Sequence, residues 1–176
     1  GIALGVLYSL GPIKLSAIGL GESSVAVAFG VLPVTGAAWL QGASIDTALL
    51  LFSLPVSAWV AAILLINEVP DVEADGACGK GTLPVRLGLP LTSRLYFAIN
   101  LAAFLIIVAL SVQGRLPLLA PLAPAGLVLL AWQASKAIIS GVADRKAITQ
   151  AIESTLAIHT IGCLWLTGCA LYFVWW

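Results

Sequence analysis

Residues 48–88 read ALLLFSLPVSAWVAAILLI-NEVPDVEADGACGKGTLPVRLG and set an almost unbroken apolar run directly against an acidic segment. The apolar part, residues 48–66, is close to the roughly 20 residues that a helix needs to cross a bilayer. The polar part, residues 67–88, holds four of the eight acidic residues of the chain. The sequence therefore predicts a membrane helix that runs into a segment able to do chemistry.

Three polar residues of that segment, Asn67, Asp71 and Asp75, are spaced at i, i+4 and i+8. If the segment is helical, they project from one face, a turn apart. Carboxylates at this spacing repel, and the repulsion is poorly screened near hydrocarbon. Protonation, exposure to water or a bound cation would each relieve it. Mg²⁺ suits the last option, since it binds through one or two carboxylates and leaves other positions to water or phosphate. Basic residues that could meet such a phosphate follow at Lys80, Arg86 and Arg94.

An ordinary solvated loop between two membrane helices is the alternative, and D-x-x-x-D alone does not exclude it. The wider string is more specific: N-E-x-P-D-x-x-x-D, followed by G-K-x-T-L-x-V-R-L-G. This composite resembles the second aspartate-rich motif of the UbiA-type intramembrane prenyltransferases, especially the 1,4-dihydroxy-2-naphthoate prenyltransferases of menaquinone synthesis. Residues 8–22 are similar to another loop of that family, which often reads Y-S-x-x-P-x-K/R-L and then G-L-G-E.

The resemblance implies a Mg²⁺-dependent enzyme that transfers an isoprenoid chain from a prenyl diphosphate to an aromatic acceptor. It implies Asp71, Asp75 and Lys80 as catalytic residues, the two aspartates being the metal ligands. The substrate-binding residues that it implies are Asn67, Arg86, Lys14 and Tyr8. Without the resemblance, Tyr8 and Lys14 are equally explained as an interfacial tyrosine and a flanking anchor of a membrane helix.

The family fold is an all-helical membrane bundle, usually of nine spans, with two aspartate-rich motifs facing each other across a cavity. The first of these motifs, close to N-x-x-x-D-x-x-x-D, is absent from residues 1–176, and Gly81 stands where relatives often have a basic or polar residue. We therefore expect residues 1–176 to be one membrane domain, the C-terminal part of a larger prenyltransferase domain. We expect this part alone to be inactive.

Composition independently predicts a membrane protein. Of the 176 residues, 61% are hydrophobic and only 9% are charged, whereas soluble domains carry about a quarter charged residues. The formal net charge is zero, which gives no electrostatic basis for binding nucleic acid. The three cysteines show no C-x-x-C spacing, so no zinc site is predicted.

The pattern along the chain predicts an all-α fold with five full transmembrane helices and part of a sixth. Residues 1–10 are typical of the end of a helix that Gly11-Pro12 terminates. The full spans are expected at residues 25–40, 48–66, 93–112, 116–139 and 152–176. A polar surface helix is expected at residues 140–151, and a kink or helix end at Pro70.

Charge bias predicts the orientation in the plasma membrane. When successive loops are assigned to alternate sides, seven of the eight Lys and Arg residues fall on the side of the acidic segment and only Arg115 on the other. The positive-inside rule then places the acidic segment in the cytoplasm and the C-terminus outside. Two other functions stay open: a transporter or ion-pathway subunit that uses Asp71 and Asp75 as cation ligands, and a non-catalytic membrane scaffold.

Overall fold

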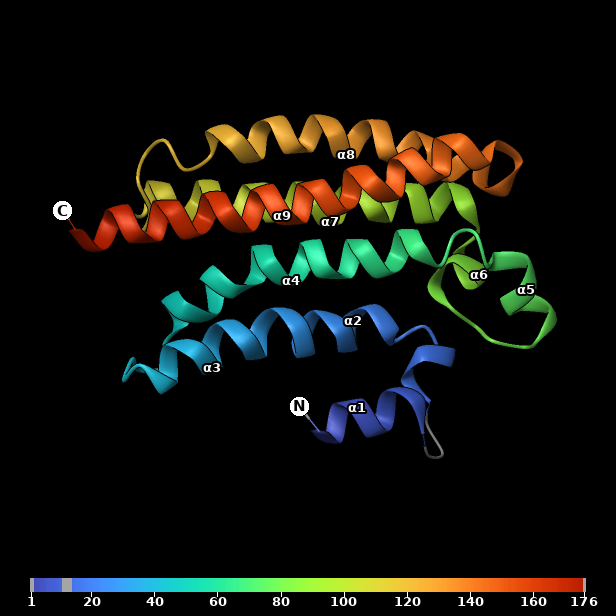
Figure 1. Ribbon diagram of the computed structural model, residues 1–176, viewed down its shortest axis with the longest axis horizontal. Helices are drawn as coiled ribbons and strands as arrows, with labels where there is room; N and C mark the ends of the chain where they lie inside the picture. The colour runs from blue at the N-terminus through green and yellow to red at the C-terminus, as the bar shows by residue number, and fades with distance from the viewer. Residues whose placement is uncertain (1, 11–13, 176) are drawn as a thin grey trace.

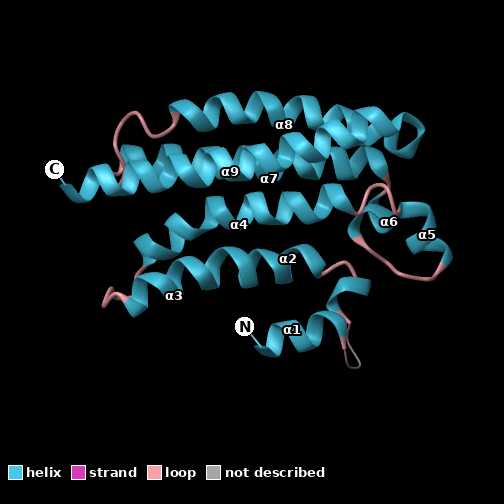
Figure 2. Cartoon of the chain, in the orientation of Figure 1, coloured by secondary structure: helices cyan, strands magenta, loops and turns pink. Residues whose placement is uncertain are grey.

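The computed structural model describes residues 2–10 and 14–175, and the regular elements within that part of the chain are all helical. Five helices are long and apolar enough to cross a membrane: Gly21–Leu40, Thr47–Asn67, Leu89–Val112, Leu122–Ser140 and Arg145–Tyr172. They lie side by side in a bundle joined by loops (Figures 1 and 2). The predicted polytopic all-α bundle is confirmed, and the chain is an integral membrane protein. The partial helix predicted at the N-terminus is α1 (Ile2–Ser9).

Helix α4 (Thr47–Asn67) is the central element of the bundle. It packs against α7 (Leu89–Val112) and α9 (Arg145–Trp175) on one side and the first span on the other. Because lipid is as apolar as a leucine side chain, membrane helices associate largely by close backbone packing at small residues. Gly162 of α9 provides such a contact, since a Cβ there would run into the ring of Trp59.

The first span crosses α4 at a second small residue. It is continuous through α2 (Gly21–Ala26), η2 (Val27–Val31) and α3 (Leu32–Leu40), and so begins four residues before the predicted start. The turn η2 is π-helical, and it ends just before Pro33, whose missing N–H removes one hydrogen bond from the regular ladder. Gly30 lies in this turn and has no room for a Cβ beside Ser57 of α4. The first span is thereby held close to α4.

Helix α4 ends at Asn67 because Pro70 has no N–H to continue the helical ladder. A turn follows, in which Val69 N donates to Ile66 O at 3.2 Å and Asp71 N donates to Glu68 O at 3.2 Å. The chain then forms two short helices, α5 (Val72–Ala77) and α6 (Leu83–Leu87), at one end of the bundle (Figure 1). The predicted helix end at Pro70 is confirmed, and the condition under which Asn67, Asp71 and Asp75 would share one helical face is therefore not met.

Two predicted boundaries in the second half of the chain are also wrong. Helix α8 (Leu122–Ser140) begins at Leu122 rather than near residue 116, because Pro117 and Pro121 keep the preceding segment in turns. Of the surface helix expected at residues 140–151, residues 145–151 are the first part of α9, which runs unbroken into the last span. The short turn η3 (Gly141–Asp144) precedes it, and Asp144 Oδ1 caps the helix by accepting from Ala147 N at 3.0 Å.

Helices α7, α8 and α9 are tied together by buried hydrogen bonds. Ser93 Oγ of α7 donates to Ser135 O of α8 at 2.6 Å. Tyr96 of α7 shares a 2.6 Å hydrogen bond between its hydroxyl and that of Thr155 in α9. In an apolar interior such groups need partners inside the protein. These contacts therefore fix the mutual position of the three helices next to the loop that carries the acidic segment.

Candidate functional site

Lys80 and Asp75 form an ion pair at the polar end of the bundle. Lys80 Nζ lies 3.1 Å from Asp75 Oδ2 and 3.3 Å from Oδ1, and Lys80 N donates to Asp75 O at 2.9 Å. The Lys80 side chain is 39% exposed and that of Asp75 is 14% exposed. Partial burial works to lower the pKa of Lys80, but the hydrogen bond and charge of Asp75, with the charge of Glu68, raise it above its ordinary value. The structure thus brings together two of the three predicted catalytic residues.

Two glutamates that were not predicted as site residues, Glu22 and Glu68, are buried next to this pair. Glu22 stands in the first turn of α2 and is 4% exposed, and Glu68 follows α4 and is 8% exposed. Burial, then the hydrogen bond and charge of Glu22, raises the pKa of Glu68 to about 8, and Asp75 adds to the rise while Lys80 opposes it. That hydrogen bond needs a proton on one of the two carboxyls. When both are ionised neither can donate, and Glu22 Oε1, Glu22 Oε2 and Glu68 Oε2 are then without a hydrogen-bond partner.

The end of α4 and the break at Pro70 together explain why sequence spacing pointed to other residues. Glu68 N still donates to Leu64 O at 3.1 Å, so α4 decides the direction of Asn67 and Glu68, and the break that separates them from Asp71 and Asp75 comes afterwards. A continuous helix would have aligned Asn67 with Asp71 and Asp75. In the structure Asn67 is exposed, and its neighbour Glu68 faces the protein interior instead. Glu22 is distant in sequence and reaches Glu68 only because α2 packs against α4. The one available signal was an acidic residue at the start of an apolar span, where it needs a partner.

The remaining predicted residues surround this centre at different depths. Tyr8 is partly buried and lies within electrostatic range of Glu68, Lys80 and Glu22. Asp71 is exposed at the start of α5, and its side chain makes no capping hydrogen bond there. Lys14 is exposed too, and its backbone is in the left-handed region with φ 41°. Tyr8 therefore interacts with the charged groups of the site, whereas Asp71 and Lys14 are exposed on the two segments that meet at Gly81 and Ala17.

Arg86 lies where the loop of residues 14–20 meets the acidic segment, and a backbone hydrogen bond joins the two there. Its Nε donates to Gly81 O at 2.8 Å, and Gly81 N donates to Ala17 O at 2.9 Å. A Cβ on Gly81 would lie 2.9 Å from Arg86 Nε, and one on Gly19 would lie 3.2 Å from Arg86 Cδ. The glycine at position 81, which departs from the family pattern, thus leaves room for the arginine to lie across both loops. The Arg86 side chain is exposed, so its other guanidinium nitrogens are accessible from solvent.

The donor set suits a hard divalent cation. Carboxylate oxygens are the ligands that Mg²⁺ prefers, and three such oxygens are buried here without a partner. Among the described residues, no three His, Cys, Asp or Glu side chains converge closely enough to form a complete metal site by themselves. The residues present therefore fit a cation whose coordination is completed by water or by substrate phosphate.

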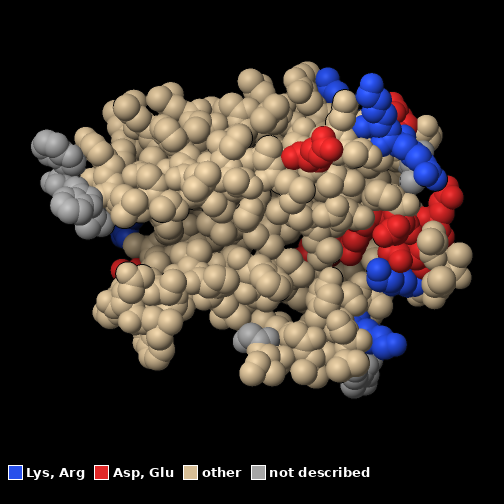
Figure 3. All heavy atoms as spheres, viewed as in Figure 1, with Lys and Arg blue, Asp and Glu red and all other residues tan. Residues whose placement is uncertain are grey.

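Charged residues gather at the end of the bundle that holds these residues. Figure 3 shows Lys and Arg side chains together with Asp and Glu side chains at the end where Figure 1 places α5 and α6. Arg94 near the start of α7, Lys136 near the end of α8, and Arg145 at the start of α9 belong to the same end by the course of their helices. Arg115 lies in the loop between α7 and α8, at the opposite end.

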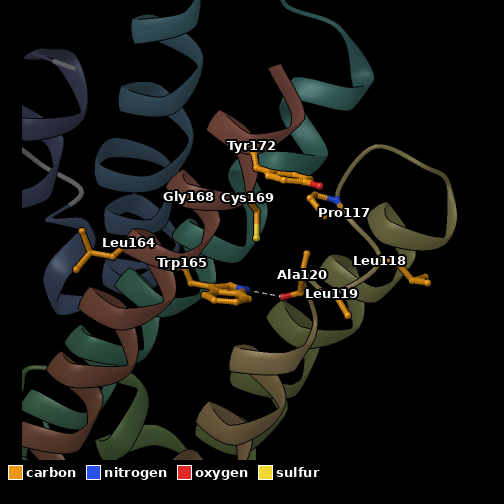
Figure 4. A pocket seen from close by; sticks show the side chains of 9 residues that line it. All are labelled: Pro117, Leu118, Leu119, Ala120, Leu164, Trp165, Gly168, Cys169 and Tyr172. Atoms are coloured by element: carbon orange, nitrogen blue, oxygen red, sulfur yellow. Dashed lines mark hydrogen bonds between the residues drawn. The ribbon is translucent and has the colours of Figure 1, made fainter. Parts of the chain in front are cut away.

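A cavity of about 950 Å³ lies away from the acidic residues, at the opposite end of the bundle. It is lined by residues 117–120 and by one face of α9 from Leu164 to Tyr172 (Figure 4). Trp165 Nε1 donates to Ala120 O at 2.7 Å across it. No acidic or basic side chain lines this cavity, so its size does not make it the place for phosphate chemistry.

Comparison with known proteins adds an independent line of evidence. Residues 1–152 match the model of the UbiA prenyltransferase family. The chain is 39% identical over 101 residues to a 1,4-dihydroxy-2-naphthoate octaprenyltransferase of Haemophilus influenzae. This alignment covers 57% of the chain and 32% of that protein. It is 38% identical over 109 residues to a protein of the same name from Escherichia coli, covering 62% of the chain and 35% of the relative.

A longer alignment is found with a 1,4-dihydroxy-2-naphthoate octaprenyltransferase of Mycobacterium tuberculosis, 31% identical over 154 residues, which covers 86% of the chain and 51% of that protein. The chain thus spans about a third to a half of the length of these relatives. No solved structure matches the chain.

Proposed function

The chain belongs to the UbiA prenyltransferase family, and from that premise we propose that it serves the transfer of an isoprenoid chain from a prenyl diphosphate to an aromatic acceptor. The acceptor would be of the 1,4-dihydroxy-2-naphthoate type, as in the names of its relatives and as menaquinone synthesis requires. The observation that carries the proposal is the Asp75–Lys80 pair at 3.1 Å beside the buried Glu68. Oxygen ligands for a cation and a basic group for phosphate meet there within one loop.

The roles follow from where charge develops. Breaking the allylic C–O bond leaves extra negative charge on the departing diphosphate, and groups that meet this charge stabilise the transition state more than the ground state. When bound, Mg²⁺ supplies Lewis-acid stabilisation of that leaving group. Asp71 and Asp75 would hold the cation, and Lys80 would turn from Asp75 toward the phosphate. Arg86 would contribute the guanidinium nitrogens that Gly81 leaves free.

Three further residues would bind the substrates. Tyr8 would face the reacting end from the last turn of α1, Lys14 would meet the diphosphate from the loop of residues 14–20, and Asn67 would be a polar neighbour of the cation. The apolar spans would hold the isoprenoid chain within the bilayer and keep water from the carbocation that C–O cleavage produces. The chain itself would therefore contribute binding, charge stabilisation and the exclusion of water.

We further propose that the acidic segment faces the cytoplasm across the plasma membrane and that the C-terminus lies outside. Seven of the eight Lys and Arg residues lie on the side of that segment, which supports this orientation by the positive-inside rule. Residues 1–176 would form one membrane domain within a larger prenyltransferase. A cation transporter is less well supported, because Glu68, Asp71 and Asp75 follow the span Thr47–Asn67 rather than lying in its middle.

The proposal is tested by activity in lipid. The protein, extended to the length of its relatives and reconstituted in vesicles, should convert a prenyl diphosphate and 1,4-dihydroxy-2-naphthoate to a prenylated naphthalene in Mg²⁺ but not in EDTA. Product is measured by liquid chromatography and mass spectrometry, and a simple phenol serves as the control acceptor. Absence of prenylated product from every aromatic acceptor tried, in a folded sample with Mg²⁺, would refute the proposal.

A further inference from the structure

Glu22 and Glu68 are a carboxyl pair to which neither the predicted site nor the proposed mechanism assigns a role. They come from different elements, the first turn of α2 and the turn after α4, and both are more than nine-tenths buried. Glu68 Oε1 lies close to the start of α2, since a Cβ on Gly21 would be 3.8 Å from it. Two acids placed in contact inside a protein are costly unless something between them carries positive charge.

The neighbouring basic group offsets the charge of this pair only in part, since the charge of Lys80 acts to lower the pKa of Glu68. Lys80 Nζ is hydrogen-bonded to both oxygens of Asp75, at 3.1 and 3.3 Å. Three of the four oxygens of the pair have no donor: Glu22 Oε1, Glu22 Oε2 and Glu68 Oε2. Buried polar atoms in folded proteins are nearly always partnered. With both carboxyls ionised, these three oxygens therefore need a partner other than Lys80.

A proton and a cation satisfy the pair to different degrees. One shared proton makes one O–H···O bond between the two carboxyls and leaves the second oxygen of Glu22 without a partner. A divalent cation with its own waters gives a partner to every one of these oxygens, and one or two carboxylates with several waters is the usual way in which Mg²⁺ is held. The count of orphaned oxygens favours the cation.

We propose that Glu22 and Glu68 together bind a divalent cation, so that the start of α2 supplies a metal ligand beside the Asp75 loop. The proposal rests on the proposed function, to which it adds ligands from a second span. Through this cation the first span and the end of α4 would be joined by charge as well as by packing. Asp71 and Asp75 would then hold a cation that is separate from this one or bridged to it by substrate phosphate.

The test measures Mn²⁺ binding by electron paramagnetic resonance in the absence of substrate. The sample is the protein extended to the length of its relatives and placed in nanodiscs. Glu22→Gln and Glu68→Gln should each weaken Mn²⁺ binding about tenfold or more and lower the number of sites, and the double variant should lose no more than either single one. Glu73→Gln is the matched control, because Glu73 is exposed in the same acidic segment and its loss removes the same charge. Equal weakening in the control would mean a general charge effect and would overturn the proposal.

Two further outcomes separate this proposal from the proposed function. If Asp75→Asn loses Mn²⁺ while Glu22→Gln and Glu68→Gln bind as the wild type does, the glutamate pair is not a cation site and the proposed function stands. If prenyl transfer fails as described above while the glutamate variants lose Mn²⁺, the cation site stands without that function. A measurement on the wild type guards against misfolded variants. In infrared spectra of the wild type at saturating Mg²⁺, no protonated-carboxyl band should remain. A protonated band that persists under these conditions would overturn the proposed cation site in favour of a shared proton.

Discussion

Replacing Lys80 by alanine separates a structural role of this residue from a catalytic one, because the two roles differ in magnitude. The Lys80–Asp75 pair spans 3.1 Å and is partly exposed. In water, Coulomb's law gives unit charges at that distance about 1.3 kcal/mol. The entropy of holding a lysine side chain in place reduces the net value of such pairs to about 0.2–1 kcal/mol. A purely structural lysine should therefore cost little stability and little activity.

A lysine that meets the leaving diphosphate has a larger effect. Loss of one group that stabilises charge in a transition state costs about 2.7–4 kcal/mol, or about 100- to 1,000-fold in kcat. We expect Lys80→Ala to show a loss of that size in Mg²⁺-dependent prenyl transfer, with the thermal unfolding midpoint in detergent almost unchanged. Because Lys80 also occupies Asp75, its removal should strengthen Mn²⁺ binding in the absence of substrate.

The control is Lys136→Ala, which removes a lysine from the same end of the bundle. Lys136 Nζ rests 3.4 Å from the centre of the Trp132 ring and not on an acid, so transfer rate and Mn²⁺ affinity should both stay near the wild-type values. The reasoning is refuted if Lys80→Ala changes kcat by less than about fivefold. It is also refuted if both lysine variants lose activity equally, because a general surface charge would then explain the loss.

Four further results are expected. Asp71→Asn and Asp75→Asn should each abolish Mg²⁺-dependent turnover of the enzyme extended to the length of its relatives. Near-normal rates for both variants at limiting Mg²⁺ would show that these aspartates are not metal ligands. In EDTA the free energy of unfolding should fall as pH rises from about 4.5 toward 8, by up to about 1.4 kcal/mol per pH unit. The folded state holds the Glu68 proton up to a pKa of about 8 against 4.5 for the free side chain, so Glu68→Gln should flatten this slope, and a slope that survives the substitution would reject the assignment. With the other two cysteines replaced by serine, the exposed Cys78 should react with impermeant maleimide only from the cytoplasm. A cysteine introduced at the exposed Gln113 should react only from outside. The reverse pattern would invert the proposed orientation. Residues 1–176 reconstituted alone should bind prenyl diphosphate weakly and transfer none, which robust turnover would contradict.

Much of the fold was predictable because it depends on local properties. Apolar length alone predicts the five spans, and the missing N–H of Pro70 predicts the end of α4. The start of α8 was misplaced because Pro117 and Pro121 lie within an apolar run that otherwise looks helical. The polar beginning of α9 was separated from its apolar part on composition, although no residue between them breaks a helix.

The candidate site was predictable only in part, since it depends on contacts between distant segments. Asp75 and Lys80 are five residues apart and form a local pair, and both were predicted from the sequence as site residues. Glu68 continues the buried face of α4, since its N donates to Leu64 O at 3.1 Å and Ala61 and Leu65 are buried, but spacing alone does not show which face of α4 is buried. Its contact with Glu22 depends on the packing of α2 against α4. A pattern of residue types therefore located the loop but not its buried acids.

The crossing of the first span over α4 has a mechanical consequence. Gly30 sits against Ser57 with no room for a side chain, and the first span packs mainly on α4, whereas α7, α8 and α9 are linked to one another. A tight crossing near the middle of a helix acts as a pivot, with the two ends of the helix as its arms. Rocking of the first span on this pivot would change the distance between Glu22 and Glu68 without moving α7–α9. Any adjustment of the acidic end by that route would be governed by the contact at Gly30, eight residues along the span from Glu22.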